Sequence, residues 1–129
     1  GAASLTRDGK TNAIKVRKCK DIRDAVLFTT FPEVGTIDER AAFDRVSKQC
    51  KLTRFGTDCY AYALLAAGQI DLVIEAGLNA FDIQGPMAVV HNAGGIVTNW
   101  QGGAAHMGGT VIAAGDAHIH AQALALLKG

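Results

Sequence analysis

Short apolar segments with the composition of β-strands alternate along this chain with segments whose apolar residues recur at helical spacing. The pattern predicts strands at 25–31, 51–55, 71–76, 96–98 and 110–114, and helices at 38–49, 57–67, 83–92 and 117–127. Such alternation is typical of an α/β domain, in which helices cover the faces of a sheet. The predicted fold is therefore an α/β layered sheet flanked by helices.

The first twenty residues follow a different pattern. Two short extended segments, 2–6 and 13–17, flank the pair Asp8-Gly9, and an Asp-Gly pair is typical of a hairpin turn. We expect a β-hairpin that belongs to a sheet of its own. The predicted domains are thus the hairpin, residues 1–20, and the α/β domain, residues 21–129.

Polar side chains stand where the predicted helices begin. Asp38, then Thr57 or Asp58, and then Asp82 are expected to be N-caps, because their side chains can accept hydrogen bonds from the first free amides of a helix. Pro86 falls within the first two turns after Asp82, where a missing N–H is tolerated.

Composition narrows the class of protein. The chain has 129 residues and a formal net charge of +1, which fits one globular domain without an obvious nucleic-acid or membrane surface. Its longest apolar run is interrupted before it reaches about 18 residues, and its N-terminus lacks a basic segment followed by an apolar one. We expect a cytoplasmic protein. Cys19, Cys50 and Cys59 form no C-x-x-C pair, so we expect reduced thiols, at least two of them buried.

Charge is distributed unevenly along the chain. Twelve of the 13 basic residues and seven of the 12 acidic residues precede position 55, whereas the last 75 residues have only Lys128 against five carboxylates. With so few charged residues, this second part cannot expose its whole surface to water. We expect another segment of polypeptide to cover some of that surface. Carboxylates without basic partners also indicate a cation nearby.

Several familiar motifs are absent from the sequence. The 15 glycines never form Gly-x-Gly, no P-loop lysine follows a glycine-rich loop, and there is no G-x-S-x-G or H-E-x-x-H. A dinucleotide-binding protein, an NTPase, a serine hydrolase and a zinc protease are therefore disfavoured. The four histidines, His91, His106, His118 and His120, are expected to be surface or cap residues.

Three ordered motifs carry a family resemblance. They are Gly56-Thr57-Asp58-Cys59-Tyr60 with its continuation to Glu75, then Phe81-Asp82-Ile83-Gln84-Gly85-Pro86, then Asn92-Ala93-Gly94-Gly95-Ile96-Val97-Thr98. Together they resemble the later half of the inositol monophosphatase-like family, and within it the histidinol-phosphate phosphatase branch is the most similar. The resemblance implies a Mg²⁺-dependent phosphomonoesterase, usually a homodimer.

The resemblance also assigns roles to individual residues. Asp82 matches a family aspartate that binds catalytic magnesium, although Phe81 replaces the usual Trp before it; the alternative is that Asp82 only caps its helix. Glu75 matches the family's substrate-binding glutamate. Gly56 and Thr57 match a loop at the start of a helix, where free N–H groups favour anions and hydroxyls.

Asp58 is the position that bears on the substrate. Inositol phosphatases commonly have a small apolar residue there, whereas Asp-Cys-Tyr resembles the histidinol-phosphate enzymes, whose substrate is a cationic aminoalcohol. A plain N-cap role for Asp58 remains open. Asp71 is expected to be structural, because it precedes a strand and can bond nearby backbone.

The family's upstream glutamate and its D-P-x-D-G-T segment, which supply further magnesium ligands and help to activate water, have no match in this sequence; Asp8-Gly9-Lys10-Thr11 lacks the Asp-Pro start. We therefore expect a C-terminal fragment that is inactive alone and whose partner is the missing N-terminal half. Two alternatives stay open. One is an inositol-1-monophosphatase or related phosphatase, and the other is a non-catalytic module that oligomerises through apolar faces.

Overall fold

The computed structural model describes residues 3–7, 10–30, 34–56, 60–105 and 108–129. Its centre is a mixed sheet of five strands in the order β4-β3-β5-β7-β6. The strands are β3 (Val26–Thr29), β4 (Leu52–Phe55), β5 (Leu72–Asn79), β6 (Ile96–Thr98) and β7 (Gly108–Ala114). β3 is parallel to both β4 and β5, whereas β7 is antiparallel to both β5 and β6.

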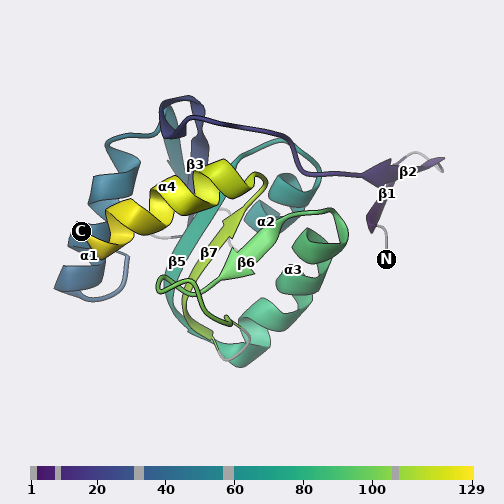
Figure 1. Cartoon of the computed structure of the whole chain (residues 1–129). Helices are drawn as coiled ribbons and strands as arrows, with labels where there is room; N and C mark the ends of the chain where they lie inside the picture. The colour runs from purple at the N-terminus through teal and green to yellow at the C-terminus, as the bar shows by residue number, and fades with distance from the viewer. Residues whose placement is uncertain (1–2, 8–9, 31–33, 57–59, 106–107) are drawn as a thin grey trace.

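Helices cover both faces of this sheet, as Figure 1 shows. One face is covered by α1 (Ile37–Ser47) and α4 (Ala117–Lys128), which pack against each other. The other face is covered by α2 (Tyr60–Ala66) and α3 (Ala80–Asn92), which also form a pair. The predicted α/β layered sheet flanked by helices is confirmed.

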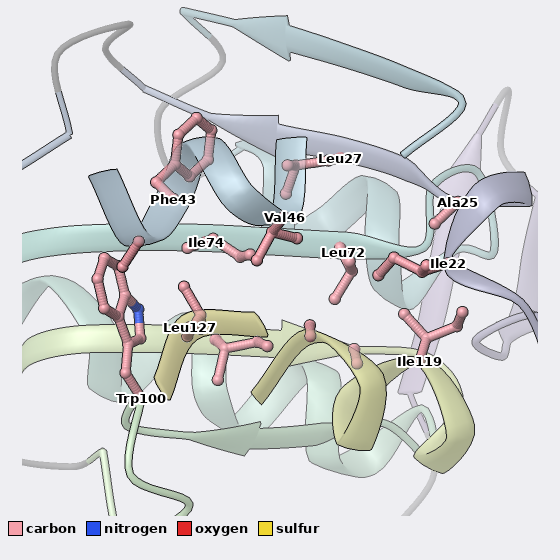
Figure 2. Close-up of a cluster of buried hydrophobic side chains, with 14 of the residues drawn as sticks. Ile22, Ala25, Leu27, Phe43, Val46, Leu72, Ile74, Trp100, Ile119 and Leu127 are labelled. Carbon is pink, nitrogen blue, oxygen red and sulfur yellow. The ribbon is translucent and has the colours of Figure 1, made fainter. Parts of the chain in front are cut away.

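The period of two along β5 divides the apolar core between the two faces. Leu72 and Ile74 belong to the cluster under α1 and α4, where Figure 2 shows them with Phe43 and Val46. Val73 points to the opposite face and belongs to the cluster under α2 and α3. Each of these fully buried side chains stabilises the fold by about 1.5–3 kcal/mol. The strand is covered on both sides, as its nearly continuous apolar sequence requires.

The N-terminal hairpin forms a separate two-stranded antiparallel sheet. Its strands are β1 (Ala3–Arg7) and β2 (Lys10–Ile14), and in Figure 1 the hairpin extends away from the main body. The second strand begins three residues earlier than predicted, because the register pairs Arg7 with Lys10. The predicted turn pair Asp8-Gly9 lies outside the described residues.

The segment between the hairpin and the sheet is tied to the α/β domain by backbone and carboxylate bonds. The Val16 amide donates to the Ala93 carbonyl at 3.1 Å, and the Cys19 amide donates to Asp116 Oδ2 at 3.0 Å. A short 3-10 helix, η1 (Ile22–Asp24), then leads into β3. The segment is therefore attached to the α/β domain by hydrogen bonds as well as by its covalent connection to β3.

Two helices begin at other residues than predicted. The N-cap of α1 is Thr36 and not Asp38, because Thr36 and Glu39 form a capping box: Thr36 Oγ1 accepts from the Glu39 amide, and Glu39 Oε1 accepts from the Thr36 amide. α3 begins at Ala80, directly after β5, so Asp82 is its third residue and not its N-cap. The proposed caps Thr57 and Asp58 lie outside the described residues.

The expectation of at least two buried cysteines is wrong. Cys19 and Cys50 are free thiols, and each is only partly buried, since Cys19 lies in the connecting segment and Cys50 lies just beyond the end of α1. Cys59 is not described. Burial still raises the pKa of Cys50 to about 12, so this thiol stays protonated at neutral pH.

Of the predicted surface or cap histidines, His91 and His118 are exposed, whereas His120 is half-buried. His106 is not described. Among the described helices, none has the length and the apolar composition that crossing a membrane would need.

Candidate functional site

Three parallel strands end at one edge of the sheet, and this edge is the candidate site. Because β3, β4 and β5 run in the same direction, their carboxyl ends meet there. The helix that follows β3 lies on one face of the sheet and the helix that follows β5 lies on the other. Ligands in open α/β sheets bind in the crevice outside the carboxyl ends where successive connections diverge in this way. The neighbouring pair β3 and β5 therefore marks the centre of the site.

Glu75 of β5 lies at this edge with both carboxylate oxygens hydrogen-bonded. Thr30 Oγ1, just after β3, donates to Glu75 Oε1 at 2.5 Å, and Tyr62 Oη, from α2, donates to Glu75 Oε2 at 3.0 Å. The residue is only 5% exposed. A buried carboxylate costs several kcal/mol unless it is hydrogen-bonded or paired, so the two hydroxyls stabilise it where it is. The arrangement offers an oriented acceptor for a hydroxyl or ammonium group.

The sequence predicted that this strand ends at residue 76, directly after Glu75, but β5 continues to Asn79. The register with β7 shifts between Glu75 and Leu78, and Gly77 has φ of 76°. A bulge of this kind bends the strand and re-aims the side chains beside it. β5 therefore changes direction directly after Glu75, while still pairing with β7.

Gly56 links the ends of β4 and β3. Its amide donates to the Thr29 carbonyl at 3.1 Å and to the Thr30 carbonyl at 2.8 Å, and its φ is 86°. The Gly56 N–H therefore already has two acceptors and is not itself a free donor for an anion, whereas the role of Gly56 in binding substrate stays a prediction. These two bonds fix the backbone of Thr30. Thr57 and Asp58, predicted with it as substrate-binding residues, lie outside the described residues.

The predicted metal ligand Asp82 lies in the first turn of α3, immediately after β5. A carboxylate in a first turn is favoured by the helix dipole, whether or not it binds a cation. The structure describes the backbone of Asp82 and not its side chain. In the part of the chain that is described, no group of three or more His, Cys, Asp or Glu residues could hold a metal ion. These residues alone do not form a magnesium shell.

Asp71 has the structural role that the sequence predicted. Its side chain accepts from the Val26 amide at 2.8 Å and from the guanidinium of Arg17. It lies at the amino ends of β3 and β5, the opposite edge from Glu75. It takes no part in the candidate site.

Sequence reasoning missed Thr30 and Tyr62. One clue to Thr30 was its position at the end of an apolar parallel strand, which is where Glu75 was also expected. The clue to Tyr62 was its place among alanine and leucine residues at helical spacing, since a tyrosine hydroxyl that becomes buried usually has a partner. Neither clue identifies Glu75 as that partner.

Comparison with known proteins gives a consistent result. A model of the inositol monophosphatase family matches residues 3–128. The chain is 40% identical over 124 residues to a protein of Arabidopsis thaliana named bifunctional phosphatase IMPL2, chloroplastic; the match covers 89% of this chain and 36% of that protein.

Solved structures agree in fold. An inositol monophosphatase from Zymomonas mobilis matches with a TM-score of 0.87 and 36% identity, over 93% of this chain and 49% of that one. The extragenic suppressor protein suhB from Bartonella henselae matches with a TM-score of 0.80 and 26% identity, over 96% of this chain and 50% of that one. This chain thus spans 36% of the curated relative and about half of the solved ones.

Proposed function

Because the chain belongs to the inositol monophosphatase family, we propose that it acts as the substrate-holding part of a hydrolase that cleaves phosphate monoesters of small alcohols. The observation that carries this proposal is the Glu75 carboxylate, held by Thr30 and Tyr62 at the carboxyl edge of the sheet. An acceptor fixed in this way suits a hydroxyl or an amine on the alcohol part of the substrate.

The proposed cofactor is Mg²⁺, with Asp82 as one ligand. Magnesium takes carboxylate oxygens, and when bound it polarises a phosphate ester and lowers the pKa of a bound water. One carboxylate does not make such a site, and the described residues supply no further group of ligands. We therefore propose that the remaining ligands come from the upstream half that the family resemblance implies, and that this chain alone releases phosphate at a negligible rate.

The substrate we favour is histidinol phosphate, which would place the protein in histidine biosynthesis. Asp58, which follows Gly56 by two residues in the sequence, would give the site a second carboxylate beside that of Glu75, and two negative charges suit a cationic aminoalcohol better than a neutral polyol. The 36% identity to an inositol monophosphatase supports inositol monophosphate as the second candidate.

We also propose that the protein forms a homo-oligomer and that it lies in the cytoplasm. Ile37, Phe55 and Tyr60 expose large apolar side chains, which would favour a homo-oligomer, as the resemblance implies. We propose the cytoplasm, whereas the name of the Arabidopsis thaliana relative assigns that protein to the chloroplast. A fluorescent fusion of the gene product distinguishes the two compartments.

The test is magnesium-dependent phosphate release from histidinol phosphate and from inositol 1-phosphate. It compares this chain with an extended protein, defined as this chain joined at its N-terminus to the upstream half that the family resemblance implies. We expect activity only in the extended protein, a higher kcat/KM on histidinol phosphate, and loss of activity in Asp82→Asn. Asp58→Ala should lower the ratio of kcat/KM on histidinol phosphate to kcat/KM on inositol 1-phosphate.

Two results would contradict the proposal. Enzyme-like rates from the short chain, abolished by Asp82→Asn, would mean that the metal ligands are misplaced. No activity in the extended protein, together with a stable specific oligomer that does not respond to magnesium, would favour the non-catalytic module.

A further inference from the structure

We propose that Thr30 and Tyr62 are positioning residues that hold the Glu75 carboxylate in one orientation toward the alcohol part of the substrate. The inference rests on the proposed function, because it assumes that Glu75 contacts substrate. It goes beyond that function by assigning a role to two residues that do not themselves need to touch the substrate.

The geometry supports two-point fixation. Each hydroxyl bonds a different oxygen of the same carboxylate, Thr30 at 2.5 Å on Oε1 and Tyr62 at 3.0 Å on Oε2. One bond would leave the carboxylate free to rotate about its terminal torsion, which is broad in glutamate. Two bonds to different oxygens, from two different elements, define the plane of the group.

Both donors are themselves held in place. The carbonyl of Thr30 accepts the Gly56 amide at 2.8 Å, and the preceding residue, Thr29, is buried in β3. Tyr62 is 2% exposed and belongs to the apolar cluster under α2 and α3. The Tyr62 ring is packed in the core and the backbone of Thr30 is fixed, so the two hydroxyls together favour one orientation of the carboxylate.

This orientation has a consequence for binding. Ordering a free glutamate side chain costs conformational entropy, and a carboxylate ordered in advance spares a ligand that cost. A carboxylate can accept about four hydrogen bonds, so the two hydroxyls do not saturate it. The arrangement fits a substrate with a hydroxyl or ammonium donor at a fixed distance from its phosphate. The effect should fall on substrate binding and not on the chemical step.

The test compares isosteric variants in the extended protein. Thr30→Val and Tyr62→Phe each remove one hydroxyl, and Thr30→Ser retains it. We expect KM to rise about tenfold in each of the first two, which corresponds to 1.4 kcal/mol, with kcat within about twofold. Thr30→Ser keeps the hydroxyl, so its KM should equal that of the parent.

Thr53→Val is the matched control. It removes a hydroxyl of the same kind from β4, where Thr53 Oγ1 lies 2.9 Å from Ser47 Oγ and away from Glu75. Its KM should equal that of the parent. An equal rise in KM in Thr53→Val would assign the effect to general loosening of the sheet and overturn the inference.

A second readout does not depend on activity. Side-chain carbon relaxation of ¹³C-labelled glutamate in the extended protein reports how ordered the Glu75 side chain is. We expect high order in the parent, Thr30→Ser and Thr53→Val, and reduced order in Thr30→Val and Tyr62→Phe. Unchanged order in those two variants would overturn the inference even in an active enzyme. Reduced order in a protein without phosphatase activity would reject the proposed function and leave the fixation of Glu75 supported.

Discussion

Arg17 holds both carboxylate oxygens of Asp71, with Nε 2.8 Å from Oδ1 and Nη2 2.7 Å from Oδ2. Asp71 Oδ2 also accepts the Val26 amide at 2.8 Å. The pair therefore joins the connecting segment to the amino ends of β3 and β5. Asp71 is 2% exposed, whereas the Arg17 side chain is 40% exposed. Water therefore reaches the guanidinium of Arg17 but not the carboxylate of Asp71.

Arg17→Ala should destabilise the fold by about 1–3 kcal/mol, because it leaves a buried carboxylate without its cation. Arg17→Lys should recover only part of this, since an ammonium cannot make the two parallel bonds. The measurement is the urea midpoint at pH 7. Arg23→Ala is the control, because its pair with Asp21 lies on the surface, and no change is expected. Equal losses in Arg17→Ala and Arg23→Ala would contradict the structural role of Asp71.

Asp116 should make the stability depend on pH in the acid range. Burial by itself would raise the pKa of Asp116, but the amide and ring of His118 and the amide of Cys19 outweigh it and lower that pKa from 3.8 to about 2. A lowered carboxyl pKa gives stability that is fully present above pH 4 and is lost as the pH falls through 2. The contribution is about 2 kcal/mol.

Asp116→Asn tests this dependence. The variant should be less stable than the parent at pH 7, and the difference should shrink between pH 4 and pH 2. Urea unfolding at pH 7, 5, 4, 3 and 2 measures it. A difference that stays constant down to pH 2 would mean that the charge of Asp116 contributes nothing.

His120 should destabilise the fold in mildly acid solution. Thr98 Oγ1 donates to the Asn99 carbonyl and so accepts from His120 Nε2, at 2.8 Å. Burial lowers the pKa of His120 below 6.5, so the folded state binds its proton less readily than the unfolded state does. Stability is therefore lost as the pH falls through 6.5.

His120→Gln should reduce the loss of stability between pH 8 and pH 5, measured as guanidinium unfolding free energy. His91→Gln, which replaces an exposed ring on α3, is the matched control. The same pH slope in His120→Gln as in the parent would remove His120 as the cause.

The stability lost on substitution of Gly56 should depend on how well the new residue adopts a positive φ, and not on the size of its side chain. A Cβ at this position would meet nothing within 4 Å, but the φ of 86° is unfavourable for side chains. Gly56→Asn should cost least, Gly56→Ala about 1 kcal/mol, and Gly56→Val most, because a β-branched residue is strained most at positive φ. Thermal unfolding measures the series. Equal stability of the alanine and valine variants would argue against backbone strain as the cause.

The local patterns in the sequence predicted the elements well. The apolar run at Leu72-Val73-Ile74 is the core of β5, and the segment from Ala117 is α4 almost to the residue. The errors occur at element ends. Asp38 was a plausible cap, but Thr36 forms a reciprocal capping box with Glu39. Which of two neighbouring residues becomes the N-cap depends on the path of the preceding loop. A short-range sequence pattern does not predict that path.

The sequence by itself determined the alternation of strands and helices, because periods of two and of 3.6 residues are local properties of the chain. It also determined the family, through three motifs in order. The tertiary structure decided which polar groups meet. Thr30 and Tyr62 stand 45 and 13 residues before Glu75, and they reach it only because β3 pairs with β5 and α2 packs against β5. It also decided that the Gly56 amide has hydrogen-bond acceptors, since these are the carbonyls of Thr29 and Thr30 at the end of the neighbouring strand β3. Strand order and the direction of helix crossovers are long-range outcomes of packing, and residue spacing does not specify them.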